Sequence, residues 1–375
     1  ASAMFLVQTR AGALVANKSV GIAGATHSSL NAAIDSLQPG DVLDVHRSVS
    51  ATVGLVIDAA GRPDAPIIIR GVADANGQRP LIQGVRDYQV PDKDKNTTVL
   101  ITEEARHLVL DTLEISNGTA VGNDVGSCVR NVGHEVTLLR TRVRDCYNHG
   151  ILNADDAGSL TFDRVEVSGA GCSPSRGMAC EDDDEKHPVY VATHPGDHPG
   201  AALRIIDSYL HDNRSGETVK TRAQRVEIRY SWIESVNQQY RALGLFGYDG
   251  TGEASVEKPI HHDIVGNVFV VSGNATSMAR FGGDSLDKSS HGRTRFVNNT
   301  VALDKSFTGE SGKSVIQLDF AIEGLIAHNN VFAVLGVQGE PALTTLVKEQ
   351  SSRKWAGGQP KLLFTHNRVP QGSIV

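Results

Sequence analysis

The stretch Val-Thr-Leu-Leu-Arg-Thr-Arg-Val at residues 136–143 decides the fold, because the chain repeats it with substitutions. Related stretches follow at 160–167 (Leu-Thr-Phe-Asp-Arg-Val-Glu-Val), 203–210 (Leu-Arg-Ile-Ile-Asp-Ser-Tyr-Leu) and 226–233 (Val-Glu-Ile-Arg-Tyr-Ser-Trp-Ile). Their starts lie 24, 43 and 23 residues apart. A period near two dozen residues, lengthened in one place by an insertion, is typical of a solenoid whose rungs carry short strands. Such a fold places functional side chains in rows on an outer face.

A second recurring strand precedes this stretch in each rung. Its copies are Ser127–Arg130, Gly150–Asn153, Pro188–Val191, Thr218–Thr221 and Ser314–Gln317. Because side chains alternate between the two faces of a strand, one set should form an inward aliphatic stack. That set is Val129, Ile151, Val189 and Val219. The set expected to point outward on one face is Arg130, Leu152, Tyr190 and Lys220.

Asparagines recur at the turn of the first repeated stretch. They are Asn267, Asn298, Asn299, Asn329, Asn330 and Asn367. Asparagines stacked from rung to rung satisfy turn backbone groups and tolerate left-handed φ values. We therefore interpret them as structural residues.

The N-terminal segment 1–40 contains the best helix signal. Residues 28–37 carry a serine cap and put Leu30, Ile34 and Leu37 on one face, and Pro39-Gly40 ends the pattern. A helix here would cover the open first rung of a solenoid. We predict a single domain, with this capping helix followed by β rungs over 41–375.

Three insertions interrupt the repeat, at 168–186, 246–262 and 281–292. We expect these loops to wall a groove on the outer face. The first contains five consecutive carboxylates, Glu181-Asp182-Asp183-Asp184-Glu185. This run is either a solvated loop or a calcium site, because hard cations bind clustered oxygens. Its spacing matches no ordered calcium loop.

Composition limits the class of protein. The chain has 375 residues, a net charge of −7 and 5% aromatic residues. The negative charge argues against a general nucleic-acid binder, whose contacts are mostly to phosphate. No stretch approaches twenty apolar residues, so we expect no membrane span.

The cysteines and the N-terminus bear on the compartment. Cys128 and Cys146 fall on consecutive strand regions, where they could pair or stack as buried thiols, and Cys172 and Cys180 flank a loop short enough for a disulfide. An even cysteine count in a loop-rich β protein favours an oxidising compartment. The chain opens Ala-Ser-Ala-Met-Phe, as a cytosolic protein or a mature form without its signal peptide would. We expect a secreted or periplasmic protein.

A family resemblance follows from these motifs. A capping helix, then Pro-Gly-Asp-Val-Leu-Asp-Val at 39–45 and β rungs with Asn-rich turns, resembles right-handed parallel β-helix proteins that act on polysaccharides, in particular the chondroitinase-B and alginate-lyase group. The phrases His187-Pro-Val-Tyr-Val and Glu217-Thr-Val-Lys-Thr-Arg-Ala223 are similar to a bacterial β-helix subfamily. The resemblance covers nearly the whole chain for the fold and a few residues for chemistry. It implies an all-β, right-handed parallel β-helix.

For activity, the resemblance implies a lyase that removes the C5 proton of a uronic acid and expels the O4 leaving group. In the chondroitinase-B pattern a lysine is the base and an arginine one rung later assists the leaving group. Lys220 and Arg241 match these positions. The pattern also implies a calcium ion, for which Asn213 and Glu217 are the candidate ligands. One of the family's paired glutamates is missing here.

A second constellation uses His187 and Tyr190. A tyrosine–histidine pair can serve as base and acid in metal-independent lyases, with arginines binding the uronate carboxylate. Arg222 lies two residues after Lys220 on the same face. The remaining substrate-binding candidates are Arg225, His149, Arg130 and Arg280. We expect Lys220 to lie near Arg222, Arg225 and Arg241, whose like charges would lower its pKa, as suits a base.

The leading hypothesis is a polysaccharide lyase acting on an anionic, uronate-containing polysaccharide or oligosaccharide. Hydrolysis needs two carboxylates across the scissile bond, and Glu217 has no evident acidic partner in the sequence. C5-epimerisation shares the first proton abstraction and stays open. A non-catalytic glycan-binding protein is the alternative from another class. Two Trp and seven Tyr argue against the broad aromatic strip that such a protein would need.

Overall fold

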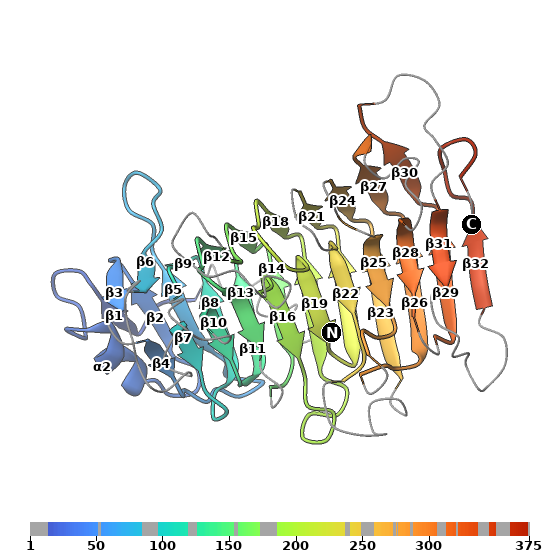
Figure 1. Ribbon diagram of the computed structural model, residues 1–375. Coiled ribbons are helices and arrows are strands. Elements are labelled where there is room, and N and C mark those ends of the chain that lie inside the picture. The colour runs from blue at the N-terminus through green and yellow to red at the C-terminus, as the bar shows by residue number, and fades with distance from the viewer. Residues whose placement is uncertain are drawn as a thin grey trace.

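The computed structural model describes part of the chain, and all structural statements below refer to that part. The described residues are 14–51, 54–84, 97–118, 126–153, 157–172, 186–236, 241–248, 259–272, 275, 277–285, 288–305, 313–319, 322–336, 345–349 and 361–373. Their strands form three parallel sheets that run side by side along the length of the molecule (Figure 1). Each rung contributes strands to the sheets in the same order along the chain. We name the sheets A, B and C in that order.

Sheet A has twelve strands in the described residues. They are β1 (Lys18–Val20), β2 (Val42–Val45), β5 (Ile67–Gly71), β8 (Arg106–Asp111), β11 (His134–Leu139), β14 (Leu160–Asp163), β17 (Ala202–Ile206), β20 (Arg225–Arg229), β23 (Ile260–Val265), β26 (Gly292–Val297), β29 (Gly324–His328) and β32 (Lys361–Thr365).

Sheets B and C each have ten strands in the described residues. Sheet B consists of β3 (Val49–Ala51), β6 (Leu81–Gly84), β9 (Glu114–Ser116), β12 (Arg142–Arg144), β15 (Glu166–Ser168), β18 (Tyr209–His211), β21 (Trp232–Ser235), β24 (Val268–Val271), β27 (Thr300–Leu303) and β30 (Val331–Val334). Sheet C consists of β4 (Leu55–Ile57), β7 (Thr97–Ile101), β10 (Ser127–Asn131), β13 (His149–Asn153), β16 (Val189–Ala192), β19 (Val219–Arg222), β22 (Leu243–Leu245), β25 (Ser277–Phe281), β28 (Ser314–Leu318) and β31 (Thr345–Glu349).

This architecture is a right-handed parallel β-helix, as the repeat predicted. Parallel neighbours need a crossover, and a crossover of this kind is right-handed in nearly all proteins. The sequence repeats because each rung contributes one strand to each sheet, and each strand pairs with the equivalent strand of the next rung. The first repeated stretch therefore contributes the strands of sheets A and B, and the second contributes the strands of sheet C.

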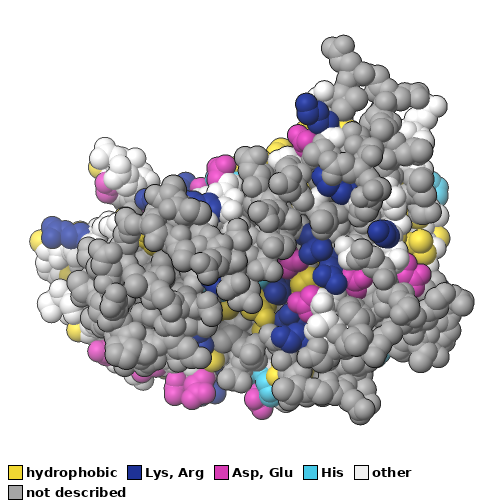
Figure 2. Space-filling model, in the orientation of Figure 1, with side chains coloured by type: hydrophobic (Ala, Val, Ile, Leu, Met, Phe, Trp, Pro, Cys, Tyr) yellow, Lys and Arg dark blue, Asp and Glu magenta, His cyan; other side chains and the backbone are white. Residues whose placement is uncertain are grey.

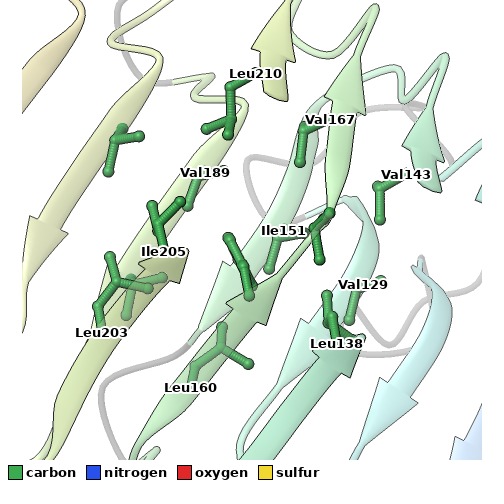
Figure 3. Close-up of a cluster of buried hydrophobic side chains, with 14 of the residues drawn as sticks. Val129, Leu138, Val143, Ile151, Leu160, Val167, Val189, Leu203, Ile205 and Leu210 are labelled. Carbon is green, nitrogen blue, oxygen red and sulfur yellow. The ribbon is translucent and has the colours of Figure 1, made fainter. Parts of the chain in front are cut away.

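The core is a set of aliphatic rows that fill the space between the three sheets. Val129, Ile151, Val189 and Val219 are aligned rung on rung in sheet C and are buried. Figure 3 shows Val129, Ile151 and Val189 of this row together with side chains such as Leu160 and Val167 from the other two sheets. The predicted inward stack is confirmed. Its physical cause is the two-residue period of the strand, which turns every second side chain into the interior.

The asparagine prediction is also confirmed. Asn267, Asn299, Asn330 and Asn367 form a ladder, in which each side-chain amide donates to the Oδ1 of the next asparagine at 3.0, 3.1 and 2.8 Å. Each amide also donates to a backbone carbonyl of the preceding rung. The adjacent Asn298 has a left-handed φ of 58°. These bonds satisfy backbone groups that the turn between sheets A and B would otherwise leave without partners.

The predicted capping helix is present and shorter than expected. Helix α2 (Leu30–Asp35) begins after Ser29, whose Oγ accepts a hydrogen bond from the Ala32 backbone N–H at 3.3 Å. Leu30 and Ile34 are buried in the same cluster as the core, and the helix packs against β1 and β4 at the N-terminal end (Figure 1). It therefore covers the first rung.

Cys128 and Cys146 form a disulfide, which decides between the two states that the sequence left open. The proposed partner of Cys172, Cys180, lies outside the described residues, as does the acidic run 181–185. The insertions 168–186, 246–262 and 281–292 are described in part, without 173–185, 249–258 and 286–287. Among the described helices, none is long and apolar enough to cross a bilayer.

Candidate functional site

The outward row of sheet C carries the candidate site. Tyr190 is paired with Lys220 in the register of β16 and β19, Lys220 with Gly244, and Gly244 with Arg280. Neighbouring rungs are about 4.8 Å apart, so Tyr190 and Lys220 lie within reach of one sugar unit, and the full row spans about 14 Å. The predicted shared face of Tyr190 and Lys220 is confirmed. Figure 2 shows Lys, Arg and carboxylate side chains mixed on this face, over β19 to β28.

Arg222 is the buried anchor of the site, with a side chain 2% exposed. Its Nε donates to Tyr190 Oη at 3.1 Å, its Nη1 to the Gly247 carbonyl at 3.0 Å and its Nη2 to Asp284 Oδ2 at 2.6 Å. The guanidinium also lies 5.6 Å from the ring centre of Phe246. The sequence predicted a substrate contact for Arg222. In the structure its guanidinium holds Tyr190 and Asp284 in place.

Lys220 projects between two aromatic rings and a carboxylate. Its Nζ lies 5.3 Å from the ring centre of Tyr190, 6.0 Å from that of Phe246 and 3.8 Å from Asp284 Oδ2. The side chain is 18% exposed. The sequence pointed to cations near Lys220 and did not reveal this carboxylate. Asp284 lies between Lys220 and Arg222 and balances part of their charge.

Glu217 and Arg241 join the site from the turn before β19 and from the start of the next rung. Arg241 Nη1 donates to Glu217 Oε1 at 3.1 Å, and Nε donates to Ser277 Oγ at 2.8 Å. The carboxylate occupies the space over Gly244, because a Cβ there would lie 2.5 Å from Glu217 Cδ. Burial raises the pKa of Glu217, and the charges of Arg241 and Lys220 oppose that rise. Glu217 thus interacts with both members of the predicted pair, by an ion pair with Arg241 and through the charge of Lys220.

Two histidines lie behind Tyr190. His187 Nδ1 accepts a hydrogen bond from the Glu217 backbone N–H at 3.0 Å, so the proton of the neutral ring is on Nε2. That Nε2 is buried and has no hydrogen-bond partner in the described structure. Burial, followed by the charges of Lys220, His149 and Arg222, lowers the pKa of His187 well below its usual value. The ring meets Tyr190 edge-on with centres 5.6 Å apart.

His149, which was predicted to contact substrate, lies in the interior of the rung. It is buried, its Nδ1 accepts from the His187 backbone N–H at 3.1 Å, and its ring centre lies 6.1 Å from that of Tyr190. His149 therefore supports the rung that carries His187 and Tyr190. Its buried position follows from the first residue of β13 lying at the corner of the rung.

Arg225 is placed elsewhere. It begins β20 in sheet A, is exposed, and its Nε donates to Glu227 Oε1 at 2.8 Å. The prediction that it lies beside Lys220 is wrong, because the chain turns from sheet C to sheet A between Arg222 and Arg225. Arg130 lies in the same outward row as Tyr190, with Leu152 between them.

Arg280 lies at the opposite end of the site from Arg130. Its Nε bonds to Asp319 Oδ2, which also accepts from Gln317 Nε2 at 3.0 Å. Its guanidinium is 5.8 Å from the ring centre of Phe246. The predicted basic row therefore extends from Tyr190 to Arg280 and passes over Phe246.

The calcium ligands that the resemblance implies do not fit one site. Asn213 Oδ1 accepts from the Ala170 backbone N–H at 3.3 Å, whereas Glu217 is bound to Arg241. The two side chains therefore serve different partners. In the described residues no group of three or more His, Cys, Asp or Glu side chains is placed to hold a metal ion. We derive no step through calcium, and a calcium requirement stays a prediction.

Sequence reasoning missed three members of the site. Asp284 comes from the insertion 281–292, which was expected to wall the groove but had no assigned ligand. Phe246 borders the insertion 246–262 and lies beneath three cations. Asp319 follows β28 and balances Arg280. The only signal for them in the sequence is their place at the edges of insertions and strands.

Comparison with known proteins supports the fold. No protein-family model and no curated protein sequence matches the chain. Among solved structures, an alginate lyase from Paenibacillus sp. str. FPU-7 is similar with a TM-score of 0.51 and 13% identity, covering 91% of this chain and 96% of that one. Pectate lyase Pel9A gives a TM-score of 0.39 and 11% identity, covering 97% and 83%. PfbA, a surface adhesin of Streptococcus pneumoniae, gives 0.46 and 10%, covering 91% and 88%.

The chain therefore belongs to the class of right-handed parallel β-helix proteins, a class that includes polysaccharide lyases. At 13% identity, the likeness to the alginate lyase establishes the fold alone. The same fold hosts several activities, so the chemistry has to be argued from the site.

Proposed function

We propose that this protein is a polysaccharide lyase that cleaves a uronic-acid-containing polysaccharide by β-elimination on the outer face of sheet C. The observation that carries the proposal is the convergence of Tyr190 and Lys220 on one face, with the Arg222 guanidinium bonded to the phenol oxygen. An elimination needs a base for C5–H, a proton donor for O4 and a cation for the sugar carboxylate.

Tyr190 is the favoured base. A guanidinium that donates to its oxygen stabilises negative charge there, and the buried ring of His187 holds the phenol from the side. Lys220 is the favoured cation and proton donor, because its amine projects from the same outward row one rung from Tyr190 and lies 3.8 Å from the carboxylate of Asp284. This assignment reverses the roles that the family resemblance implied for Lys220.

In the proposed reaction the C5–H bond breaks and its proton passes to the phenolate oxygen of Tyr190, while the electron pair forms a double bond between C4 and C5. The C4–O4 bond breaks, and O4 takes a proton from Lys220 Nζ. A proton transfer from the phenol to the amine, directly or through solvent, restores both groups. The product is a shorter chain with an unsaturated uronate at its new end.

The test is ultraviolet absorbance of that unsaturated uronate, measured while the protein is mixed with a panel of polyuronates, with and without EDTA. Cleavage should fall by about 10²-fold or more in Tyr190→Phe, which keeps the ring and removes the proton-transfer oxygen. Lys220→Ala should lose cleavage as well. A wild-type rate that EDTA abolishes would show a metal requirement. No absorbance change with any polymer would refute the lyase proposal.

Hydrolysis is the second candidate, and one observation favours it. Glu217 has a raised pKa, as a general acid needs, and Asp284 supplies the second carboxylate that the sequence did not reveal. New reducing ends without an unsaturated product would identify a hydrolase. A change of uronate configuration without chain cleavage would identify an epimerase. Binding without either would identify a glycan-binding protein.

We also propose a secreted or periplasmic location. The Cys128–Cys146 disulfide supports it, because disulfides persist in oxidising compartments. An extended anionic polysaccharide would also meet its enzyme outside the cytoplasm. Fractionation of the native host, with a thiol-labelling assay of these two cysteines, tests the location. Protein confined to the cytosol with both thiols reduced would refute it.

A further inference from the structure

Exposed aromatic side chains gather on sheet B, away from the candidate site on sheet C. Tyr209 on β18 is 41% exposed, Trp232 on β21 is 44% exposed, and Tyr230 at the turn before β21 is 66% exposed. Tyr209 and Trp232 are register partners on adjacent rungs, and their ring centres lie 6.4 Å apart. We call these three residues the aromatic platform.

The platform is held in place by hydrogen bonds. Glu234 Oε1 accepts from Trp232 Nε1 at 2.7 Å and from Tyr209 Oη at 3.2 Å. His211 stacks on Tyr209 with ring centres 3.8 Å apart, and its Nδ1 lies 2.7 Å from Asp212 Oδ2. Two neighbouring rings are thus fixed through their polar atoms, which leaves apolar ring surface exposed.

The third ring is accommodated by a glycine of the next rung. A Cβ at Gly266 would lie 2.7 Å from the ring atoms Cδ1 and Cε1 of Tyr230. The Tyr230 ring therefore lies across that turn, while remaining the most exposed member of the platform. Any side chain larger than hydrogen at position 266 would displace it.

The charge around the platform differs from that of the candidate site. After burial, the causes that raise the pKa of Tyr209 are the carboxylates of Glu234, Asp212 and Glu166. Glu166 is paired with Arg142 at 2.8 Å, which leaves Glu234 and Asp212 as the carboxylates that disfavour a uronate carboxylate here. These carboxylates still offer oxygens as hydrogen-bond acceptors for sugar hydroxyls.

We propose that the aromatic platform is a binding site for uncharged pyranose rings of a polysaccharide. Exposed Trp and Tyr rings stack on the apolar faces of sugars, and the surrounding carboxylates accept bonds from hydroxyl groups. The site lies on a different sheet from Tyr190 and Lys220. It would attach the protein to a neutral polysaccharide while the sheet C site acts on an acidic one, and it does not depend on the cleavage reaction.

The test uses Trp232 as its own reporter. The chain has two tryptophans, so Trp355→Phe leaves Trp232 as the single one. This variant is titrated with soluble neutral polysaccharides (β-glucan, xylan, galactomannan) and with polyuronates, and Trp232 fluorescence is followed. We expect a saturable change with at least one neutral polymer and none with the polyuronates. No change with any neutral polymer, or a change with polyuronates alone, would overturn the proposal.

Matched variants locate the binding surface by retardation in gels that contain the same neutral polymers. Trp232→Ala and Tyr209→Ala should weaken binding by about tenfold or more, as for a dominant aromatic contact. Tyr209→Phe, which keeps the ring, should lose less. Tyr190→Phe should lower cleavage by about 10²-fold or more and leave retardation by neutral polymers unchanged, which separates the two proposals. Undiminished binding by folded Trp232→Ala would overturn the platform.

Discussion

Replacing Arg222 should reveal how much the site depends on one buried guanidinium. The Arg222→Met variant removes the bonds to Tyr190, the Gly247 carbonyl and Asp284 while keeping much of the side-chain volume. Breaking a buried ion pair costs about 3–5 kcal/mol, because the remaining charge stays without its partner. Asp284 is 23% exposed and regains some hydration, so we expect the lower end, about 3 kcal/mol of unfolding free energy.

Two control variants isolate the cause of this loss. Tyr190→Phe removes the hydrogen bond to Arg222 Nε, keeps the ring and should cost about 1 kcal/mol. Arg225→Met replaces an exposed arginine of the neighbouring sheet and should change stability by less than about 0.5 kcal/mol. The double variant of Arg222 and Tyr190 should destabilise less than the sum of the single variants, because both remove the same bond.

The assay is urea unfolding followed by circular dichroism, with midpoint and slope compared among the variants. Cleavage of the polyuronate is measured on the same samples, and Arg222→Met should lose activity together with Tyr190→Phe. The reasoning is refuted if Arg222→Met unfolds at the wild-type midpoint. It is also refuted if the two stability losses add without coupling, since the bond between Arg222 and Tyr190 would then contribute nothing.

Three further predictions concern the surroundings of the site and the turns. Gly244→Ala should lower the unfolding free energy by about 1–3 kcal/mol, because the new Cβ meets the Glu217 carboxylate. Adding Glu217→Ala should restore part of this loss. An unchanged unfolding free energy in the single variant would contradict the placement of Glu217. Thermal stability should fall as the pH drops below 6.5, the usual pKa of histidine, because the His187 side chain takes up a proton in the unfolded chain and not in the folded one. His187→Gln should therefore make the dependence of stability on pH shallower. An unchanged dependence would show that this ring is not buried in its neutral form. Asn299→Ala should lower the unfolding free energy by about 3 kcal/mol, because it removes the side-chain bonds of the asparagine ladder. The control Thr300→Ala, at an exposed position, should change it by less than about 0.5 kcal/mol. Equal urea midpoints for the two variants would argue against the ladder.

The structure also changes one argument made from composition. Few tryptophans and tyrosines argued against an aromatic binding surface, yet Tyr209 and Trp232 are neighbours on adjacent rungs, and the exposed Tyr230 lies in the turn just before Trp232. Composition counts residues over the whole chain. A solenoid can bring a small number together, because residues one rung apart in sequence become direct neighbours across the strands.

The sequence by itself determined the repeat, the inward stack and the outward row of sheet C. Strand alternation has a period of two, and parallel pairing joins equivalent positions of successive rungs. Tyr190 and Lys220 therefore had to share a face once the rungs were aligned. The asparagine ladder and the N-terminal helix were predicted for a similar reason, because each depends on local backbone preferences.

Only the tertiary structure decided which charges meet. Asp284 is 62 residues from Arg222 in sequence, and it reaches the site because an insertion returns over sheet C. Glu217 lies over Gly244 because that position has no side chain, and Arg225 leaves the site because a corner intervenes. Loop paths and corner geometry depend on packing between rungs. The periodic pattern of a single strand carries no information about them.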